Sequence, residues 1–351
     1  MSHLSSKAQT VLGPVDAADL GVTITHEHLL IYASHIAKPP AAADERALFD
    51  APVTLELLGR LRYGKLVNLD NCRLAGEQAA IEETLLFKQA GGQTIVDATS
   101  IGIGRDPRGL AAIARATGLN IIMGSSYYVE ETHPADHRLG EKAEAELAED
   151  IAHDVLEGAD GTGIRAGLIG EVGCSWPLSE VERKVLRASA RAQRMTGAPL
   201  MIHPGRDQRA PLEILAVLDK AGADLSRTVM CHIDRTIDRT EILTELANTG
   251  CFLEYDLFGF EHSYYSWSLP VDMPNDAGRL RWLRWLIDHG CLGRLVISHD
   301  ICFKDKLVRY GGHGYGHILE HVVPLMRDKG FAEPEIAAIL VDNPRRLLAF
   351  G

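Results

Sequence analysis

The sequence predicts an α/β protein of 351 residues whose single domain folds as a (β/α)₈ barrel. Eight short apolar segments read as strands, and all but the first are followed closely by a segment with a helical pattern. No linker or shift in composition divides residues 1–351. Because regular alternation of strands and helices produces a parallel sheet, eight such units favour a closed barrel. A doubly wound open sheet is the alternative, but Gly102-x-Gly104 lacks the third glycine of a dinucleotide fingerprint.

The composition is that of a globular protein with a large core, with 46% hydrophobic and 24% charged residues. A net charge of −12 argues against nucleic acid and anionic membrane surfaces as partners, although a local pocket can still attract a small anion. The six cysteines lack CxxC spacing, and no apolar leader or membrane-spanning run is present. We therefore expect a cytoplasmic protein that acts on a small molecule.

The N-terminal part contains a predicted hairpin at about residues 8–20 and then the first core strand, within Gly21–Leu30. The first helix is delayed by a long insertion, about residues 32–74, that is rich in alanine and proline. A connection of this length in a compact domain is typical of a functional lid or of partial disorder.

From residue 75 onward the pattern becomes regular. Ser179 and Glu182 have the spacing of a capping box, and Pro107 suits the first turn of a helix. We expect helices at 75–92, 106–118, 139–157, 179–197, 210–221, 237–249, 278–289 and 317–329. The strands between them are expected at 93–99, 120–128, 165–173, 198–205, 227–234, 251–259 and 294–300.

Side chains of metal-ligand type stand at the carboxyl ends of five predicted strands. His26 and His28 lie two residues apart, so both point to the same side of the first strand, and Glu27 points to the other. The carboxyl ends of barrel strands meet at one face, where active sites are built. The convergent set predicts a metal centre made of His26, His28, Glu171, His203, His232 and Asp300.

The number of ligands indicates two divalent ions, because four histidines and two carboxylates exceed what a single zinc ion uses. A carboxylate such as Glu171 can bridge two ions, and a water between them becomes acidic enough to ionise near neutral pH. This donor set suits zinc, with manganese, cobalt or iron as alternatives.

Other arrangements are less consistent with the pattern. Ser298, His299 and Asp300 cannot form a nucleophilic triad, because adjacent strand residues face opposite ways. Arg235, Lys304 and Arg309 follow the sixth and eighth strands and could hold an anionic group of a substrate; of these, Arg235 and Lys304 are our candidate substrate-binding residues.

Several runs resemble the phosphotriesterase family of the amidohydrolase superfamily, and most closely its phosphotriesterase-related branch: GEVGCSWPL, HPGRD, HIDRT, EYDLFG and SHDICFK…YGGHGYGH. The resemblance implies that His26, His28 and Asp300 bind a buried ion. It further implies that His203 and His232 bind a more exposed ion, that Glu171 bridges the two, and that Asp300 accepts the proton of the attacking hydroxide. We also expect a homodimer.

Two departures from the family pattern concern the chemistry. The best-known members bridge their ions with a carboxylated lysine, whereas Glu171 stands at that strand end here. Members that hydrolyse organophosphates or lactones tend to carry His or Arg after the aspartate of strand seven, whereas Leu257 follows Asp256. Tyr128 matches a family tyrosine that approaches the metal site and could orient a carbonyl group.

The leading hypothesis is a metal-dependent hydrolase that uses a metal-bridging hydroxide to cleave a small carboxylic ester, lactone or amide. A phosphoester or organophosphate hydrolase with the same machinery is the first alternative. A metal-containing binding protein without turnover and a metal-assisted lyase or isomerase are the others.

Overall fold

The protein is described here from a computed structural model that covers residues 6–63, 67–134, 138–262, 265, 267–268 and 271–351. Parallel strands form the centre of the fold, and each is short and buried. In chain order they are β3 (Thr23–Glu27), β6 (Thr94–Asp97), β7 (Asn120–Met123), β8 (Ile169–Gly173), β9 (Leu200–His203), β10 (Thr228–Met230), β11 (Phe252–Tyr255) and β12 (Leu295–Ile297).

These strands form two parallel arcs, one in the order β12-β11-β10-β9-β8 and the other in the order β3-β6-β7. Backbone hydrogen bonds join the arcs at both ends. The amide of Gly170 donates to Ser125 O (2.8 Å), and the amide of Asp300 donates to His26 O (3.1 Å). The predicted (β/α)₈ barrel is confirmed.

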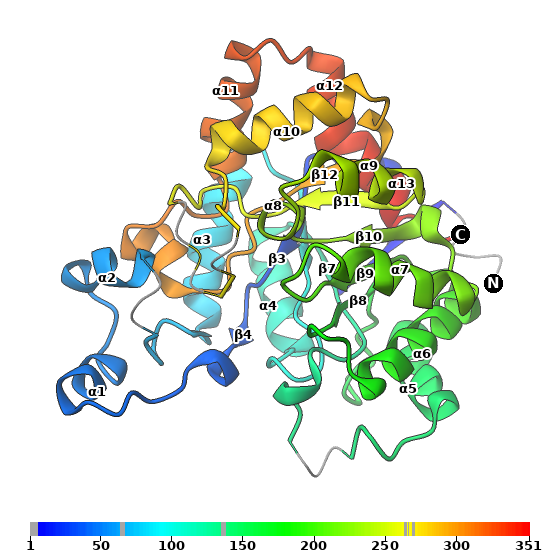
Figure 1. The fold of residues 1–351 in the computed structure, drawn as a ribbon, viewed down its shortest axis with the longest axis horizontal. Coiled ribbons are helices and arrows are strands. Elements are labelled where there is room, and N and C mark those ends of the chain that lie inside the picture. The colour runs from blue at the N-terminus through cyan, green and yellow to red at the C-terminus, as the bar shows by residue number, and fades with distance from the viewer. Residues whose placement is uncertain (1–5, 64–66, 135–137, 263–264, 266, 269–270) are drawn as a thin grey trace.

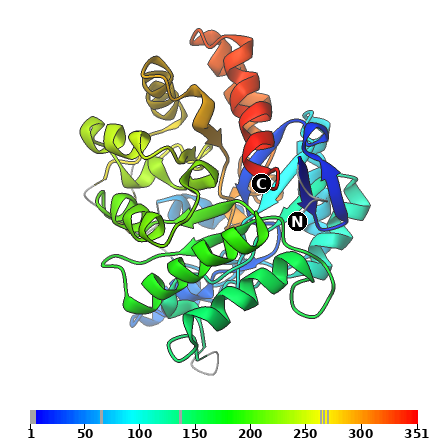
Figure 2. The same cartoon turned by 90° about the vertical axis from the view of Figure 1, so that its right-hand side faces the viewer.

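Helices surround the strands (Figures 1 and 2). Ser179 and Glu182 form the predicted capping box, since the Glu182 amide donates to Ser179 Oγ (3.1 Å) and the Ser179 amide to Glu182 Oε2 (3.2 Å). The helices that follow the strands are α3 (Glu77–Gln89), α4 (Pro107–Thr117), α5 (Glu144–Leu156), α6 (Glu180–Thr196), α7 (Ala210–Lys220), α8 (Ile233–Thr236), α9 (Thr240–Asn248), α10 (Asp276–Asp288) and α11 (Val323–Asp328).

Several boundaries differ from the prediction. Helix α5 begins at Glu144 and not at residue 139; before it, the carbonyls of Leu139, Gly140 and Lys142 accept hydrogen bonds from the Lys184 ammonium group (2.6–3.1 Å). All the strands from β6 onward except β8 end earlier than expected, and the C-terminal region adds the helices α12 (Glu333–Ala337) and α13 (Asn343–Leu348), which the pattern did not predict.

The described part of the insertion at 32–74 contains α1 (Ala43–Phe49), α2 (Leu58–Arg62) and β5 (Arg73–Leu74), which pairs antiparallel with β4 (Ile31–Tyr32). Asn68 Nδ2 donates to the carbonyls of Leu48 (2.8 Å) and Ala51 (2.7 Å), so side-chain hydrogen bonds tie the end of α1 to the segment before β5. Figure 1 shows α1 and α2 on the side toward which β11 points.

The opposite end of the barrel is closed. The predicted hairpin is present as β1 (Lys7–Thr10) and β2 (Gly13–Asp16), and the Phe350 amide donates to Lys7 O (2.9 Å) beside it. The beginning of the described chain and its C-terminal end therefore lie together at this end (Figures 1 and 2). A separate apolar cluster that includes Val96, Met201 and Val296 packs near it. In the described part of the chain, no helix is long and apolar enough to cross a membrane.

Candidate metal centre

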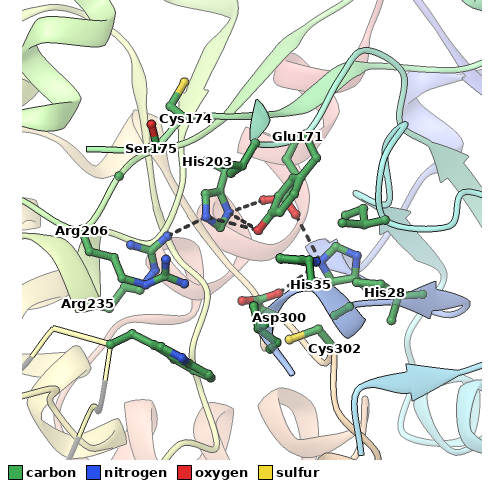
Figure 3. Close-up of a pocket in the computed structure, with 18 of the residues that line it drawn as sticks. His28, His35, Glu171, Cys174, Ser175, His203, Arg206, Arg235, Asp300 and Cys302 are labelled. Atoms are coloured by element: carbon green, nitrogen blue, oxygen red, sulfur yellow. Dashed lines mark hydrogen bonds and ion pairs between the residues drawn. The ribbon is translucent and has the colours of Figure 1, made fainter. Parts of the chain in front are cut away.

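The six predicted ligands come together at the carboxyl ends of the strands. Glu171, on β8, lies in the middle of the set. Its Oε2 atom is 2.8 Å from His203 Nδ1 and 3.4 Å from His26 Nε2, and its Oε1 atom is 3.5 Å from His28 Nε2. His28 Nε2 is also 3.2 Å from Asp300 Oδ1. Side chains from separate strands thus direct their donor atoms to one place, as Figure 3 shows for four of them.

Two overlapping groups of donors are compact enough to surround an ion. The donor atoms of His26, His28 and Asp300 lie within 4.8 Å of one another, as do those of His26, Glu171 and His232. Glu171 belongs to the second group, and its other oxygen lies 3.5 Å from His28 Nε2 of the first, so the arrangement is compatible with two ions that share one carboxylate.

A buried nitrogen atom of His26 indicates whether a cation fits among these donors. His26 Nε2 has no hydrogen-bond partner among the described residues, although its side chain is completely buried. An unpaired polar atom in the interior is costly, and His26 Nε2 lies 3.4 Å from Glu171 Oε2 and 3.8 Å from Asp300 Oδ1, so a cation placed among these atoms would meet three donors. The chemistry of the donor set, imidazole with carboxylate, suits zinc and similar ions. The residues present therefore fit a metal centre.

The charge states of two of the imidazoles, His203 and His232, also favour coordination. Burial lowers the pKa of His203 to about 3, with Arg235 contributing in the same direction. Burial, Arg235 and His203 hold the pKa of His232 well below its ordinary value. Both rings are therefore neutral near pH 7, which is the form that binds metal. Burial opposes ionisation of Glu171, but His203 and His26 bring its pKa well below the usual range.

A buried carboxylate on the reverse side of β3 fixes the position of Asp300. Glu27 accepts hydrogen bonds from the His299 amide (2.9 Å), the Ser298 hydroxyl (2.7 Å) and the Ile301 amide (3.0 Å). Asp300, within this loop, has a φ of 50°, a left-handed conformation that costs free energy in a residue other than glycine. His299 Nδ1 is 2.6 Å from Glu27, so this histidine belongs to the network that supports Asp300. This agrees with the expectation that Ser298, His299 and Asp300 do not form a nucleophilic triad.

Strand β11 supplies no predicted ligand but contacts two of them. Asp256 Oδ1 lies 2.8 Å from His232 Nδ1, and its Oδ2 accepts from the His232 amide (2.8 Å). Glu254 Oε2 lies 3.4 Å from His26 Nδ1, and the hydroxyl of Thr25 donates to its other oxygen. Carboxylates on the far nitrogen of a ligating histidine fix the tautomer and the ring orientation. The sequence analysis did not identify Glu254, although its i, i+2 spacing from Asp256 was a usable signal.

Glycine permits β8 to bring Glu171 inward. Gly170 has a φ of +136°, and a Cβ atom built on it would lie 2.4 Å from Met201 O on β9. A larger residue would therefore meet the neighbouring strand's backbone, which cannot move aside cheaply.

A pocket of about 410 Å³ opens above the centre. His28, Glu171, His203 and Asp300 form part of its lining, whereas His26 and His232 lie deeper. Figure 3 shows the guanidinium groups of Arg206 and Arg235 on one side of this pocket and His28 with Asp300 on the other. The remaining wall is largely apolar and aromatic and includes Ile36, Ile103, Trp176, Leu257, Phe260, Tyr265, Trp267 and Phe303.

The candidate substrate-binding residues separate into two classes. Tyr128 and Arg235 line the pocket, and the Tyr128 hydroxyl oxygen lies 3.3 Å from His203 Nε2. The expectation for Lys304 was wrong: it is not part of this lining, and its ammonium group pairs with Asp70 (2.6 Å). Arg309 also lies elsewhere, 3.6 Å from Glu82 on the surface.

Sequence reasoning missed two pocket residues. Arg206 follows β9 within the run HPGRD, so the rule that found the strand-end ligands would have reached it. His35 belongs to the long insertion and packs against Tyr128, with ring centroids 5.7 Å apart. Only the folded position of that insertion brings His35 to the pocket.

Comparison with known proteins places this geometry in context. A sequence model described as the phosphotriesterase family matches residues 6–348. The N-acetyltaurine hydrolase of Xenopus tropicalis is 47% identical over 352 residues, which cover 100% of both chains. The crystal structure of a resiniferatoxin-binding protein from Rhodobacter sphaeroides superposes with a TM-score of 0.93 and 37% identity, covering 99% of this chain and 98% of that one. A Deinococcus radiodurans PTE-like lactonase mutant gives a TM-score of 0.76 and 29% identity, with coverage of 98% and 100%.

Proposed function

Because the chain belongs to the phosphotriesterase family and is a metal-dependent hydrolase, we propose that it hydrolyses the amide bond of N-acetyltaurine or of a closely similar N-acyl amine. The similarity to N-acetyltaurine hydrolases extends over the entire chain. The observation that carries the proposal is the position of Asp300. Its side chain is 16% exposed and lies on the floor of the pocket, where a substrate can reach it, while the rings of His26 and His232 are buried behind it.

The proposed division of ligands combines the observed contacts with the family resemblance. His26, His28 and Asp300, which form one compact donor group, would hold one divalent ion. His203 and His232, which both lie within 3.4 Å of Glu171 Oε2, would hold the other, and Glu171 would be shared. Zinc is the ion we propose, with manganese, cobalt or iron as alternatives. When bound, the ions would supply a Lewis acid for the carbonyl oxygen and a water that ionises near neutral pH.

The protein's own groups would then handle the proton and the orientation of the amide. A C–O bond forms and the C–N bond breaks, so one proton must pass from the attacking water to the leaving nitrogen. Asp300, beside the floor, accepts this proton and returns it. Tyr128 carries a phenol that is protonated at neutral pH, and it can donate to the carbonyl oxygen from its place next to His203.

The test is a direct assay with the zinc-loaded protein. We expect release of taurine from N-acetyltaurine, detected by mass spectrometry, with one oxygen of the acetate derived from ¹⁸O-labelled water. A lactone and a phosphotriester serve as comparison substrates. Faster turnover of either comparison substrate than of N-acetyltaurine would overturn the proposed substrate while leaving the hydrolase class intact.

A further inference from the structure

The pocket contains a buried cation that pairs with no carboxylate among the described residues. Arg235, on α8, is only 2% exposed, and it forms no ion pair with any described residue. Its guanidinium group contacts two oxygen atoms, the carbonyl of Pro204 (3.2 Å) and the hydroxyl of Thr236 (3.3 Å), and both are uncharged. A guanidinium group taken out of water is costly unless an anion balances it.

Other buried cations of this protein are paired. Arg279, which is completely buried, lies 2.8 Å from Asp234 and 3.1 Å from Asp276. The buried Lys306 lies 3.1 Å from Asp305 Oδ2. Arg235 therefore differs from Arg279 and Lys306, because these buried cations pair with a carboxylate and Arg235 does not.

Its location shows where the missing anion would come from. Arg235 Nη2 lies 3.2 Å from His203 Nε2, and the opposite nitrogen of that ring faces Glu171. The guanidinium group is thus one imidazole ring away from the metal donors, and it lines the same pocket. Arg206 faces this pocket too, with its Nε donating to the Tyr265 hydroxyl (2.8 Å) and its guanidinium over the Trp267 ring (5.6 Å).

The carboxylates of the pocket do not compensate these charges. Glu171 and Asp300 are directed toward the metal donors, and Glu131 is exposed at the edge of the lining. Two arginines therefore place positive charge on one side of the cavity, in a protein whose net charge is −12.

We propose that Arg235, assisted by Arg206, forms a subsite for a sulfonate or carboxylate on the amine side of the substrate. The inference rests on the proposed function and deepens it, because it names the feature by which an acyl amine is selected. In N-acetyltaurine only two methylene groups separate the amide nitrogen from the sulfonate. That short span is comparable with the distance across the His203 ring, which separates Arg235 from Glu171. A neutral amide would leave the buried guanidinium unpaired, so the site rejects it.

The experiment compares two substrates that differ in charge but not in shape: N-acetyltaurine and its neutral methyl sulfone analogue, N-(2-methylsulfonylethyl)acetamide. Each is assayed with the zinc-loaded parent, with Arg235→Gln and with Arg235→Lys, and metal content is measured on every sample. We expect the parent to prefer the anion by about 10- to 100-fold in kcat/KM, the range for a hydrogen bond to a charged group. Arg235→Gln should reduce that preference to near unity, chiefly through KM, and Arg235→Lys should restore part of it.

Lys304→Met is the matched control, because it removes a positive charge that is close to Asp300 in the sequence but lies outside the pocket. The preference of this variant for the anionic substrate should equal that of the parent. Equal losses on both substrates in Arg235→Gln would show that Arg235 only supports His203, which would overturn the subsite.

Binding of ethanesulfonate, measured by calorimetry, separates this inference from the proposed reaction. Binding that weakens in Arg235→Gln supports the subsite even if N-acetyltaurine is not hydrolysed, whereas unchanged binding contradicts it.

Discussion

Two parts of the pocket are built in opposite ways: the floor, formed by the metal donors, and the arginine wall, formed by Arg206 and Arg235. On the floor, the metal donors are supported from behind: Thr99 Oγ1 contacts His28 Nδ1 (2.9 Å), and Asp256 contacts His232 Nδ1 (2.8 Å). On the wall, Arg235 has only neutral partners, and Arg206 has a tyrosine hydroxyl. The floor is thus suited to ions that remain bound, whereas the positive charge of the arginine wall would be balanced only by an anionic group of a substrate.

This contrast has consequences for substitutions. Changes on the floor should affect metal retention and turnover for every substrate, because all substrates meet the same centre. Changes on the wall should affect the choice among substrates. The predictions below test this separation, beginning with the largest expected effect.

Asp300→Asn should lower turnover by about 10²–10⁴-fold, the usual contribution of a general base. Asparagine keeps an oxygen for coordination but cannot accept a proton, so much of the metal should remain bound. Steady-state rates and elemental analysis on the same sample measure both effects. Two bound ions together with near-normal turnover would show that Asp300 is not the proton acceptor.

Glu254→Gln tests the support behind the floor. Glutamine keeps the size of the side chain but loses the charge that faces His26 Nδ1, so metal affinity should fall by about 10–100-fold. Competition with a chelator measures this loss, and added zinc should restore most of the turnover. The matched control is Glu245→Gln on the exposed surface of α9, which should retain the parent affinity. If both variants bind zinc equally well, Glu254 does not position His26.

Lys304→Met should alter kcat/KM by no more than about twofold, because the ion pair with Asp70 is partly exposed and pairs of this kind contribute little. The measurement uses N-acetyltaurine and the neutral sulfone side by side. A selective loss on the anion would return Lys304 to the substrate site and weaken the distinction between wall and surroundings.

Reconstitution of the metal-free protein should proceed equally well with and without bicarbonate. Glu171 already provides a carboxylate between the two donor groups, whereas a carboxylated lysine would require carbon dioxide to form. Recovery of activity after zinc addition, followed in degassed and in bicarbonate-containing buffer, measures the difference. A strong dependence on bicarbonate would mean that a lysine supplies the bridge instead of Glu171.

Local sequence patterns were sufficient for the barrel and for its ring of strand-end donors. Strand periodicity orients His26 and His28 together, and the alternation of strands with helices brings Glu171 and Asp300 to the same face. These are regularities over a few residues, which a chain displays before it folds. The short helices α1 and α2 have weak periodicity and were missed; α1 is held by side-chain hydrogen bonds from Asn68, a residue about twenty positions away in the sequence.

The tertiary structure alone decided which charges are paired. Lys304 is paired with Asp70 across 234 residues, and His26 meets Glu254 across 228, while Arg235 is left without a carboxylate. The sequence determined which groups stand at the ends of the strands. Whether each is neutralised by another side chain or left facing the pocket depends on long-range packing, because an ion pair requires two distant segments to meet within a few ångströms.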